Sequence, residues 1–234
     1  SYAVIKRLVE RKILFTYERE VGRLGDAGEE HVEHIKLLNQ AQQDAYNQIV
    51  FQFLKKNVVL VHGVTSSGKT EIYIHLIKKA LNEKKQVLYL LPEIALTVQI
   101  TSRLRHVFGN KMGIYHSKYS DAERVEIWKK QLSPHPYEVI LGARSAVFLP
   151  FQQLGLVIID EEHETSFKQQ DPSPRYHARS VAIMLAQMYD AKTLLGTATP
   201  SAESYYNATQ GKYGLVSLTT RYQGIELPEI QVID

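Results

Sequence analysis

The chain has no cysteine among its 234 residues, and it has only one tryptophan and three methionines. The absence of cysteine excludes disulfide bonds, thiolate zinc sites and cysteine nucleophiles within this stretch. No run approaches the roughly eighteen apolar residues that a membrane span requires, and the N-terminal segment has no apolar region of the secretory type. We therefore expect an intracellular protein that has no membrane contact.

An excess of charge of one sign is also missing. The 28 lysine and arginine residues face 25 aspartate and glutamate residues, which gives a formal net charge of +3 with histidine neutral. Apolar residues at 44% and charged residues at 23% are ordinary for a soluble globular chain, so neither a disordered tail nor a coiled coil is indicated. Because the basic residues are spread along the chain, charge alone favours a nucleic-acid partner only weakly.

The first 36 residues differ in pattern from the rest. Apolar residues recur there at helical spacing, and residues 14–20 (LFTYERE) then alternate as in a strand. Three glycines between residues 22 and 28 indicate a linker over about residues 22–34. A helix that leads into a hairpin strand resembles the end of a winged-helix module. Residues 1–36 are therefore predicted to be the C-terminal part of a winged-helix domain and its linker.

Residues 37–234 are predicted to form one α/β unit with a mainly parallel sheet. Apolar runs typical of buried strands occupy residues 58–62, 86–91, 138–142, 154–160 and 191–197. Amphipathic helical segments separate these runs, so helices are expected on both faces of the sheet. In such sheets ligands bind at the carboxyl ends of the strands, and the search for functional residues begins there.

The first candidate site follows the first apolar run. Residues 63–70 read GVTSSGKT, which matches G-x-x-x-x-G-K-[ST] between a strand and a helix that starts near Glu71. Glycines let the backbone wrap a phosphate chain, Lys69 can reach the β and γ phosphates, and Thr70 can hold Mg²⁺. The alternative is a glycine-rich turn with no phosphate chemistry. The predicted phosphate-binding residues are Gly63, Val64, Thr65, Ser66, Ser67, Gly68, Lys69 and Thr70.

A second candidate site follows the run at residues 154–160, where the sequence continues as DEEH (160–163). Carboxylates crowded at the end of a buried strand are costly unless a cation or a reacting water uses them. Asp160 is the candidate Mg²⁺ partner opposite Thr70, and Glu161 is the candidate base that activates the attacking water. The alternative is a solvated acidic loop. Together with the loop at Lys69, the motif predicts nucleoside triphosphate hydrolysis.

These two motifs, with GTATP at residues 196–200, resemble motifs I, II and III of superfamily 2 helicases. Further strings strongly resemble the primosomal protein N′ (PriA) family: LNQAQ (38–42), LPEIALT (91–97), HS (116–117) with Ser120, Glu123, Arg124 and Trp128, GARSAVF (142–148), FKQQ (167–170) and YHAR (176–179). The resemblance covers residues 38–234. It implies the first RecA-like P-loop NTPase lobe of such a helicase.

The same resemblance implies an ATP-driven 3′-to-5′ DNA helicase of the bacterial cytoplasm, which restarts replication at stalled forks and assembles the primosome. The implied cofactors are ATP and Mg²⁺. The implied partners are single-stranded and forked DNA, primosome and helicase-loading proteins, and single-stranded-DNA-binding protein, with no membrane. The family also carries a zinc-binding cysteine cluster, and this chain, which has no cysteine, has no zinc site.

Within the family pattern, Gln42 resembles the glutamine that reads adenine, because an amide can both donate and accept hydrogen bonds. The alternative is an exposed helix residue. Residues 165–177 resemble an aromatic-rich loop that couples DNA contact to ATP hydrolysis, although an ordinary loop can also carry two aromatic residues. Base stacking and phosphate contacts in this loop are assigned to Phe167, Lys168, Arg175, Tyr176 and His177.

Further family positions follow other strands. Arg144 and Thr97 match places where the family touches the DNA backbone, and on spacing alone both residues could be structural caps. Thr197 and Thr199 match residues that link nucleotide state to lobe movement, and His163 is expected to take part in the same coupling. A metal role for His163 is not expected, because the sequence near it offers no further ligands at the spacing of a metal site.

No second lobe with catalytic arginines is found in the sequence. An arginine from the opposite lobe stabilises the transition state in enzymes of this kind, so the chain alone is expected to bind nucleotide weakly and to hydrolyse little. Three alternatives remain open: another superfamily 2 DNA translocase, a nucleotide-regulated helicase-loading platform in which unwinding is incidental, and, more weakly, a P-loop kinase.

Overall fold

The computed structural model describes residues 7–9, 11, 13, 35–64, 67–96, 98–116 and 119–219. The predicted winged-helix segment and its linker lie mostly outside the described residues, apart from a helical turn at residues 7–9. Three predicted site residues, Thr65, Ser66 and Thr97, also lie outside them. Among the described helices, none has the length and apolar character needed to span a membrane.

Seven parallel strands form a single sheet, in the order β3-β4-β2-β5-β6-β1-β7. The strands are β1 (Val58–Gly63), β2 (Gln86–Leu90), β3 (Met112–Tyr115), β4 (Val139–Gly142), β5 (Leu154–Asp160), β6 (Lys192–Thr197) and β7 (Gly214–Leu218). The mainly parallel α/β fold is therefore confirmed, and so are all five predicted strands. Strands β3 and β7 were not predicted, because both are short and contain glycine, so neither gives a long apolar run.

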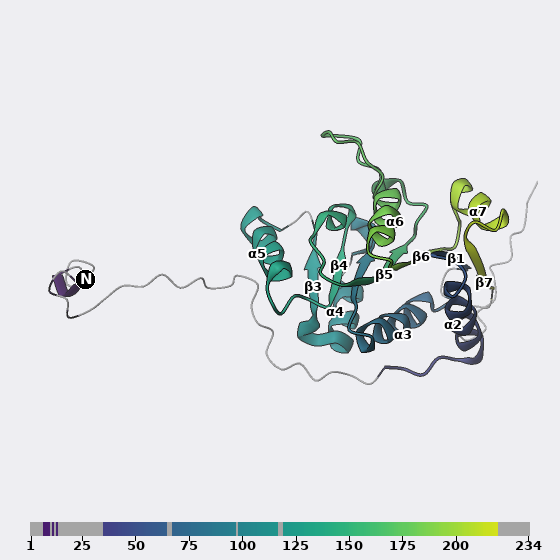
Figure 1. Ribbon diagram of the computed structural model, residues 1–234, viewed down its shortest axis with the longest axis horizontal. Helices are drawn as coiled ribbons and strands as arrows, with labels where there is room; N and C mark the ends of the chain where they lie inside the picture. The colour runs from purple at the N-terminus through teal and green to yellow at the C-terminus, as the bar shows by residue number, and fades with distance from the viewer. Residues whose placement is uncertain are drawn as a thin grey trace, which may run out of the picture.

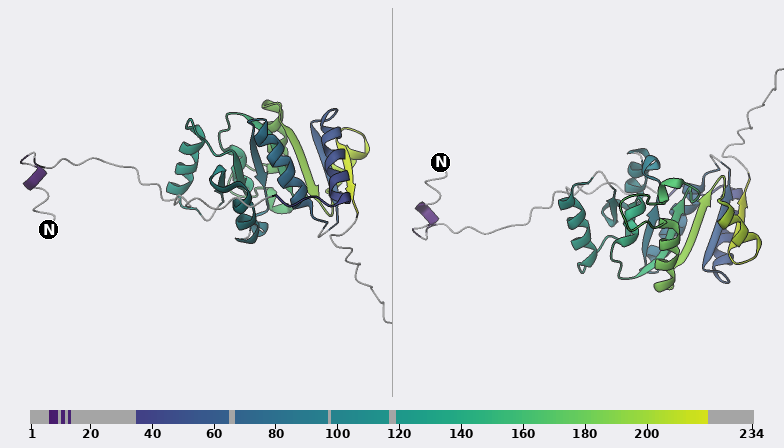
Figure 2. Two further views of the ribbon diagram at one scale, coloured as in Figure 1. Left: turned by 90° about the horizontal axis from the view of Figure 1, so that it is seen from below. Right: turned by 90° about the horizontal axis from the view of Figure 1, so that it is seen from above.

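Helices cover both faces of the sheet (Figures 1 and 2). They are α2 (Gln40–Phe53), α3 (Lys69–Asn82), α4 (Val98–Phe108), α5 (Asp121–Leu132), α6 (Ala178–Met188) and α7 (Ala202–Thr209). Alternate residues of β1 show the division: Val59 and Val61 pack in one core with α2, α3 and α4, whereas Val58 and Leu60 pack in the other with α5, α6 and α7. This is the two-sided burial expected of a parallel sheet.

Small side chains bring α6 close to the sheet. Ala178, Ala182 and Ala186 follow one another at four-residue intervals and are each at most 1% exposed, so they lie on one face of the helix. That face contacts β5 and β6. The N-terminus of α6, and with it the segment that precedes the helix, is therefore held near the carboxyl ends of these strands.

The sheet order decides which motifs meet. The loop after β1 and the acidic motif after β5 flank β6, so the two are not on adjacent strands. In the register, Asp160 pairs with Gly196, and Val61 pairs with Gly196 from the other side. Gly196, which has no side chain, therefore lies between the two motifs. The candidate site is built around this position on β6.

Candidate nucleotide site

The loop at residues 63–70 joins β1 to α3 with an open helix end. Gly68 precedes the helix with φ 81°, a left-handed conformation that glycine adopts without strain. A side chain at Gly63 would press on Ser67 Oγ at 3.1 Å and on Lys69 Cδ at 3.2 Å, so the close fold of the loop requires glycine there. No side chain of the described residues caps α3. A helix end of this kind binds anions through its N–H groups and dipole.

Within the described structure, two polar side chains of the loop lack a charged or hydrogen-bonding partner that would satisfy them. Lys69 is only 8% exposed, and its Nζ donates to the neutral carbonyl oxygen of Gly63 at 2.9 Å. Ser67 Oγ is buried and has no hydrogen-bond partner among the described residues. A buried ammonium and an unsatisfied hydroxyl are both costly on their own. Phosphate oxygens would satisfy both groups, which is the fit expected of a nucleotide site.

Gln42 holds helix α2 against this loop. It is 1% exposed, so the alternative reading as an exposed helix residue is wrong. Its Oε1 accepts from the Asn39 N–H at 3.0 Å in a capping box, and its Nε2 donates to the Gly68 carbonyl at 3.4 Å. The side chain therefore lies next to the phosphate loop with its amide engaged by protein groups. Adenine recognition by Gln42 stays a prediction.

Asp160 ends β5 in a ring of hydrogen-bond donors. Its Oδ1 accepts from the Tyr73 hydroxyl at 3.1 Å and from the Glu161 N–H at 3.2 Å, and its Oδ2 accepts from the Tyr89 hydroxyl at 3.4 Å. Burial, and then the charge of Asp160, raise the pKa of both tyrosines well above the ordinary value, so both remain donors. Neither tyrosine was among the predicted site residues. Only the position of Tyr73, one helical turn after Lys69, could have indicated it.

The surroundings also make Asp160 hard to ionise. Burial, and secondly the neighbouring charge of Glu161, raise its pKa from 3.8 to about 6, although Lys69 and the Tyr73 hydroxyl act in the opposite direction. The effect of Lys69 means that the two predicted motifs share one electrostatic site. A carboxylate strained by burial gains from a divalent cation, and Mg²⁺ commonly binds through one or two carboxylates together with phosphate oxygens.

Mg²⁺ and a nucleotide thus fit the residues present. Thr70 is the second residue of α3, directly after Lys69. No group of three or more histidine, cysteine or acidic side chains that could hold a metal by protein ligands alone occurs in the described part of the chain. Such a group is not needed for Mg²⁺, which keeps waters and takes phosphate oxygens as ligands. Thr70 and Asp160 remain the predicted protein ligands.

Glu161 adopts a strained backbone conformation at this site. Its φ is 49°, in the left-handed region that residues with a side chain rarely enter. Such strain is of the order of 1–3 kcal/mol and is often found where a side chain must be aimed for function. The carboxylate lies 3.7 Å from His163 Nδ1 and is about one third exposed. Glu161 is therefore accessible to a water molecule, as its predicted role as base requires.

The absence of a side chain at Gly196 makes room for the contact between Tyr73 and Asp160. A Cβ at this position would overlap the Tyr73 hydroxyl and come within 3.1 Å of Asp160 Oδ1. We expect Gly196→Ala to lower the free energy of unfolding by about 1–3 kcal/mol, as overpacking does, measured by thermal unfolding. Adding Tyr73→Phe should recover part of the loss because it removes the overlapping oxygen. An unchanged midpoint in Gly196→Ala would contradict this reading.

His163 connects the acidic motif to the segment after β6. Its Nδ1 lies 2.7 Å from Thr197 Oγ1, and its Nε2 lies 3.4 Å from Thr199 Oγ1. Thr197 Oγ1 also accepts from the Thr199 N–H at 3.1 Å. The structure therefore brings together all three residues expected to link nucleotide state to lobe movement. Their role in that movement stays a prediction.

Glu162 was not among the predicted site residues, and it is 0% exposed. Its carboxylate accepts from the Ser201 N–H at 2.7 Å, from the Ser201 and Ser204 hydroxyls at 3.0 and 2.8 Å, and from Arg179 Nη1 at 2.5 Å. Burial alone would raise its pKa, but these donors together lower it. Glu162 is therefore a buried, ionised carboxylate that joins α6 and α7 to the end of β5.

The predicted aromatic-rich loop projects from the domain between β5 and α6 (Figure 1). A stacking role for Phe167 is contradicted, because its ring is 1% exposed and packs in the core beneath α6. Tyr176 is half-buried and meets the ring of the exposed Phe148 edge to face, with centroids 4.9 Å apart. Sequence reasoning could not separate these cases, because both aromatic residues stand beside polar neighbours in a loop.

The base of this loop is tied together by several contacts. Arg144 Nη1 donates to the carbonyl oxygens of Ser166 and Lys168 at 3.2 and 3.1 Å. A β-bridge joins Lys168 to His177, and Lys168 Nζ donates to the Arg175 carbonyl at 3.4 Å. Arg144 thus anchors the loop in this structure. Arg175 is exposed, and the DNA contacts of these residues stay predictions.

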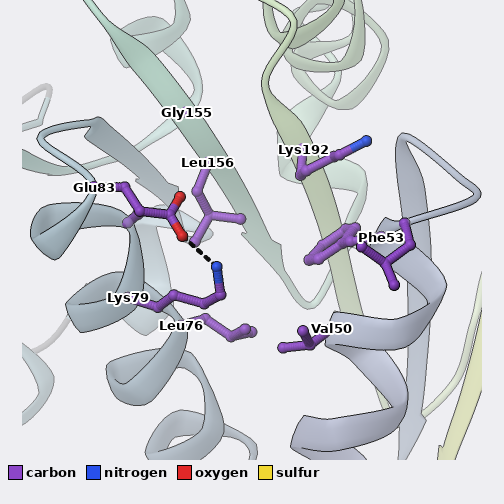
Figure 3. Close-up of a pocket in the computed structure, with 10 residues that line it drawn as sticks. Val50, Phe53, Leu76, Lys79, Glu83, Gly155, Leu156 and Lys192 are labelled. Carbon is purple, nitrogen blue, oxygen red and sulfur yellow. Dashed lines mark hydrogen bonds and ion pairs between the residues drawn. The ribbon is translucent and has the colours of Figure 1, made fainter.

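A separate pocket of about 220 Å³ lies beside the amino ends of β5 and β6, away from the carboxyl ends that carry the candidate site (Figure 3). Apolar side chains from α2 and α3, among them Val50, Phe53 and Leu76, line it together with the start of β5. An ion pair between Lys79 and Glu83 stands at its side. The pocket contains none of the predicted site residues. The chemistry of the side chains, and not cavity size, therefore locates the candidate site.

The sequence of the chain is similar to those of known proteins. The sequence model of the DEAD/DEAH box helicase family matches residues 39–208. The chain is 40% identical to "Replication restart protein PriA" of Bacillus subtilis over 238 aligned residues, which cover the whole chain and 29% of that protein. The protein of the same name from Chlamydia trachomatis is 45% identical over 199 residues, 84% of this chain and 26% of its own length. The chain thus spans less than a third of these relatives.

Solved structures share the fold at low sequence identity. A structure of RecG bound to a three-way DNA junction aligns with 97% of this chain and 27% of its own, at a TM-score of 0.57 and 17% identity. Mycobacterium smegmatis helicase Lhr bound to single-stranded DNA and AMP-PNP aligns with 76% of this chain and 25% of its own, at a TM-score of 0.57 and 21% identity. At such identities the likeness concerns the RecA-like α/β fold alone.

Proposed function

Because the chain belongs to the DEAD/DEAH box helicase family, we propose that it is the ATP-binding lobe of a DNA helicase that acts in replication restart. The observation that carries the proposal is the shared site of Lys69 and Asp160, in which a buried ammonium and a strained carboxylate face the same space. The names of the full-length relatives, which match over the whole chain, support the biological role.

In this proposal each side chain has a defined task. Lys69 and the N–H groups at the start of α3 bind and orient the phosphates, and Gln42 holds the nucleotide base. Thr70 and Asp160 hold Mg²⁺, which neutralises charge on the phosphates when it is bound. Glu161 accepts the proton of the attacking water. The transition state also needs an arginine from a second lobe, so this chain alone hydrolyses little ATP.

The DNA partners are proposed to be single-stranded and forked DNA, contacted without sequence preference. The exposed Arg175 and the half-buried Lys168 suit phosphate oxygens, and Tyr176 and His177 offer ring faces and edges to bases. Arg144 and Thr97 are assigned to the DNA backbone. Translocation from 3′ to 5′ is proposed from the family resemblance of the sequence alone. The same holds for primosome and helicase-loading partners, single-stranded-DNA-binding protein and a place in the bacterial cytoplasm.

The test is ATP hydrolysis by the full-length protein with and without single-stranded DNA, beside the same assay on this 234-residue chain. We expect the DNA to raise turnover of the full-length protein by about tenfold or more, and the chain alone to be nearly silent. Turnover that ignores DNA would overturn the motor assignment. It would favour the nucleotide-regulated loading platform, in which ATP binding changes a docking surface.

A further inference from the structure

The contacts of Glu162 join three segments that the proposed function uses separately. Glu162 itself directly follows Asp160 and Glu161 in the chain. Arg179 lies two residues after His177, at the start of the helix that ends the projecting loop. Ser201 lies two residues after Thr199 and caps helix α7 through its side chain. Glu162 therefore follows the water-activating glutamate directly, and its carboxylate contacts Arg179 and Ser201, which lie two residues from the loop and from Thr199.

This junction is rigid because the carboxylate is fully surrounded. Arg179 is 12% exposed, and its Nη1 donates to both Glu162 Oε2 and Ser201 Oγ at 2.5 Å. A buried carboxylate that loses its cation is left with a large desolvation cost, so the pair cannot separate freely. If the start of α6 shifts, Glu162 must shift with it or exchange its partners. Packed junctions of this kind have discrete arrangements and do not deform gradually.

Hydrogen bonds also hold the first strand of the projecting loop, residues 166–169. Arg144 holds the carbonyls of Ser166 and Lys168, and the Gln169 N–H donates to the Tyr176 carbonyl at 2.9 Å. The two strands of the loop thus move together at their base. A force applied at the exposed tip can reach the carboxylates along residues 161–167, where the Glu164 N–H donates to the Glu161 carbonyl at 2.9 Å, and also through the first turn of α6 and Arg179.

We propose that Arg179 and Glu162 are positioning residues that transmit DNA contact at residues 168–177 to Asp160 and Glu161. Arg179 is then required for the stimulation of ATP hydrolysis by DNA, but not for DNA-independent hydrolysis. This inference rests on the proposed function. Neither residue is assigned a contact with the nucleotide in this mechanism, because the two side chains bind each other and the Glu162 carboxylate is buried among Arg179, Ser201 and Ser204.

The experiment compares Arg179→Gln and Arg179→Lys with the wild-type full-length protein. The measured quantities are kcat and KM for ATP with and without saturating single-stranded DNA, the Kd for that DNA, and the thermal midpoint. We expect DNA-independent kcat and the DNA Kd to stay within about twofold, while DNA-stimulated kcat falls roughly tenfold in Arg179→Gln. Arg179→Lys keeps the buried charge and hence the fold, and a smaller fall in the same ratio is expected.

A matched control, Gln86→Ala, distinguishes a specific role of Arg179 in DNA stimulation from a general loss of stability. Gln86 is 5% exposed and stands at the amino end of β2, where it donates to the Tyr137 carbonyl and accepts from the N–H groups of Gln152 and Gln153. Its loss should lower the thermal midpoint without changing the ratio of stimulated to basal kcat. The proposal is overturned if both Arg179 variants keep the wild-type ratio, or if Gln86→Ala lowers the ratio equally. A wild-type protein that DNA does not stimulate overturns the proposed function itself.

Discussion

In the full-length protein, Lys69→Ala is expected to reduce ATP turnover by about 10²–10³-fold, the usual cost of removing one main electrostatic contact to a transition state. Lys69 is 8% exposed and has only the neutral Gly63 carbonyl as a hydrogen-bond partner in the described structure. Its charge is thus kept in the loop without an anion bonded to it. Nucleotide binding should weaken together with turnover, because the ground state and the transition state both carry the phosphates.

The control for this variant is Lys79→Ala on the same helix. Lys79 is 45% exposed and pairs with Glu83 near the far end of α3, so its removal changes neither the loop nor the charge near Asp160. We expect turnover close to wild type and a stability change within about 0.5 kcal/mol. Equal losses in the two variants would mean that helix α3 had been damaged, and the role assigned to Lys69 would then be wrong.

Lys69→Ala has a second consequence, for Asp160. Because the Lys69 charge lowers the pKa of Asp160, its removal should raise that pKa above about 6. Mg²⁺ needs the ionised carboxylate, so the variant should require a higher pH for any remaining Mg²⁺-dependent nucleotide binding. This coupling follows from the shared site, and it would be absent if the two motifs faced different spaces.

The chemistry of this site was readable from the sequence because its parts are local. The segment 63–70 carries its own glycines, lysine and threonine, and Asp160 and Glu161 follow directly after an apolar strand. Parallel strands end at one edge of the sheet, so both motifs had to lie on that edge. The order of the strands was not readable. A sequence does not state that β6 lies between the two motifs, or that Gly196 bounds the space there.

Contacts between residues far apart in the chain could not be predicted either, because they depend on the order of the strands and on the packing of the helices. Tyr89 reaches Asp160 only because β2 is the neighbour of β5, and Arg179 meets Glu162 only after α6 has folded back on the sheet. The burial of Phe167 depends on the small residues of α6, which leave room beneath the helix. Local pattern thus gave the reacting groups. It could not give the residues that hold them, because those are set by tertiary packing.

The nucleotide-free protein is destabilised by one of its own functional groups, and Asp160→Asn should reveal this. Asparagine keeps Oδ1 as an acceptor for Tyr73 and for the Glu161 N–H, and its Nδ2 can donate to the Tyr89 oxygen. The variant therefore retains the local hydrogen bonds and loses only the buried charge. ATP turnover should fall by about 10²–10³-fold, because the amide cannot replace a carboxylate at Mg²⁺.

The stability of the same variant should move in the opposite direction and depend on pH. The folded-state pKa of Asp160 is raised from 3.8 to about 6, so its stability contribution is complete below about pH 3.8 and is lost as the pH rises through about 6. That shift corresponds to about 3 kcal/mol at most, and because Asp160 as a whole residue is only partly buried, the expected gain of Asp160→Asn is about 1–2 kcal/mol. The gain should grow between about pH 4 and pH 7 and then stay level.

Thermal unfolding of nucleotide-free protein over this pH range measures the gain, with Asp190→Asn as the control. Asp190 is an exposed residue after α6 with φ 52°, a conformation that asparagine also tolerates, so its substitution should be neutral at every pH. Addition of Mg²⁺ and ADP should then reverse the order, because ligand binding stabilises the wild type more than the variant. A gain that is largest at low pH, or that persists with ligand, would contradict the strained carboxylate on which the site assignment depends.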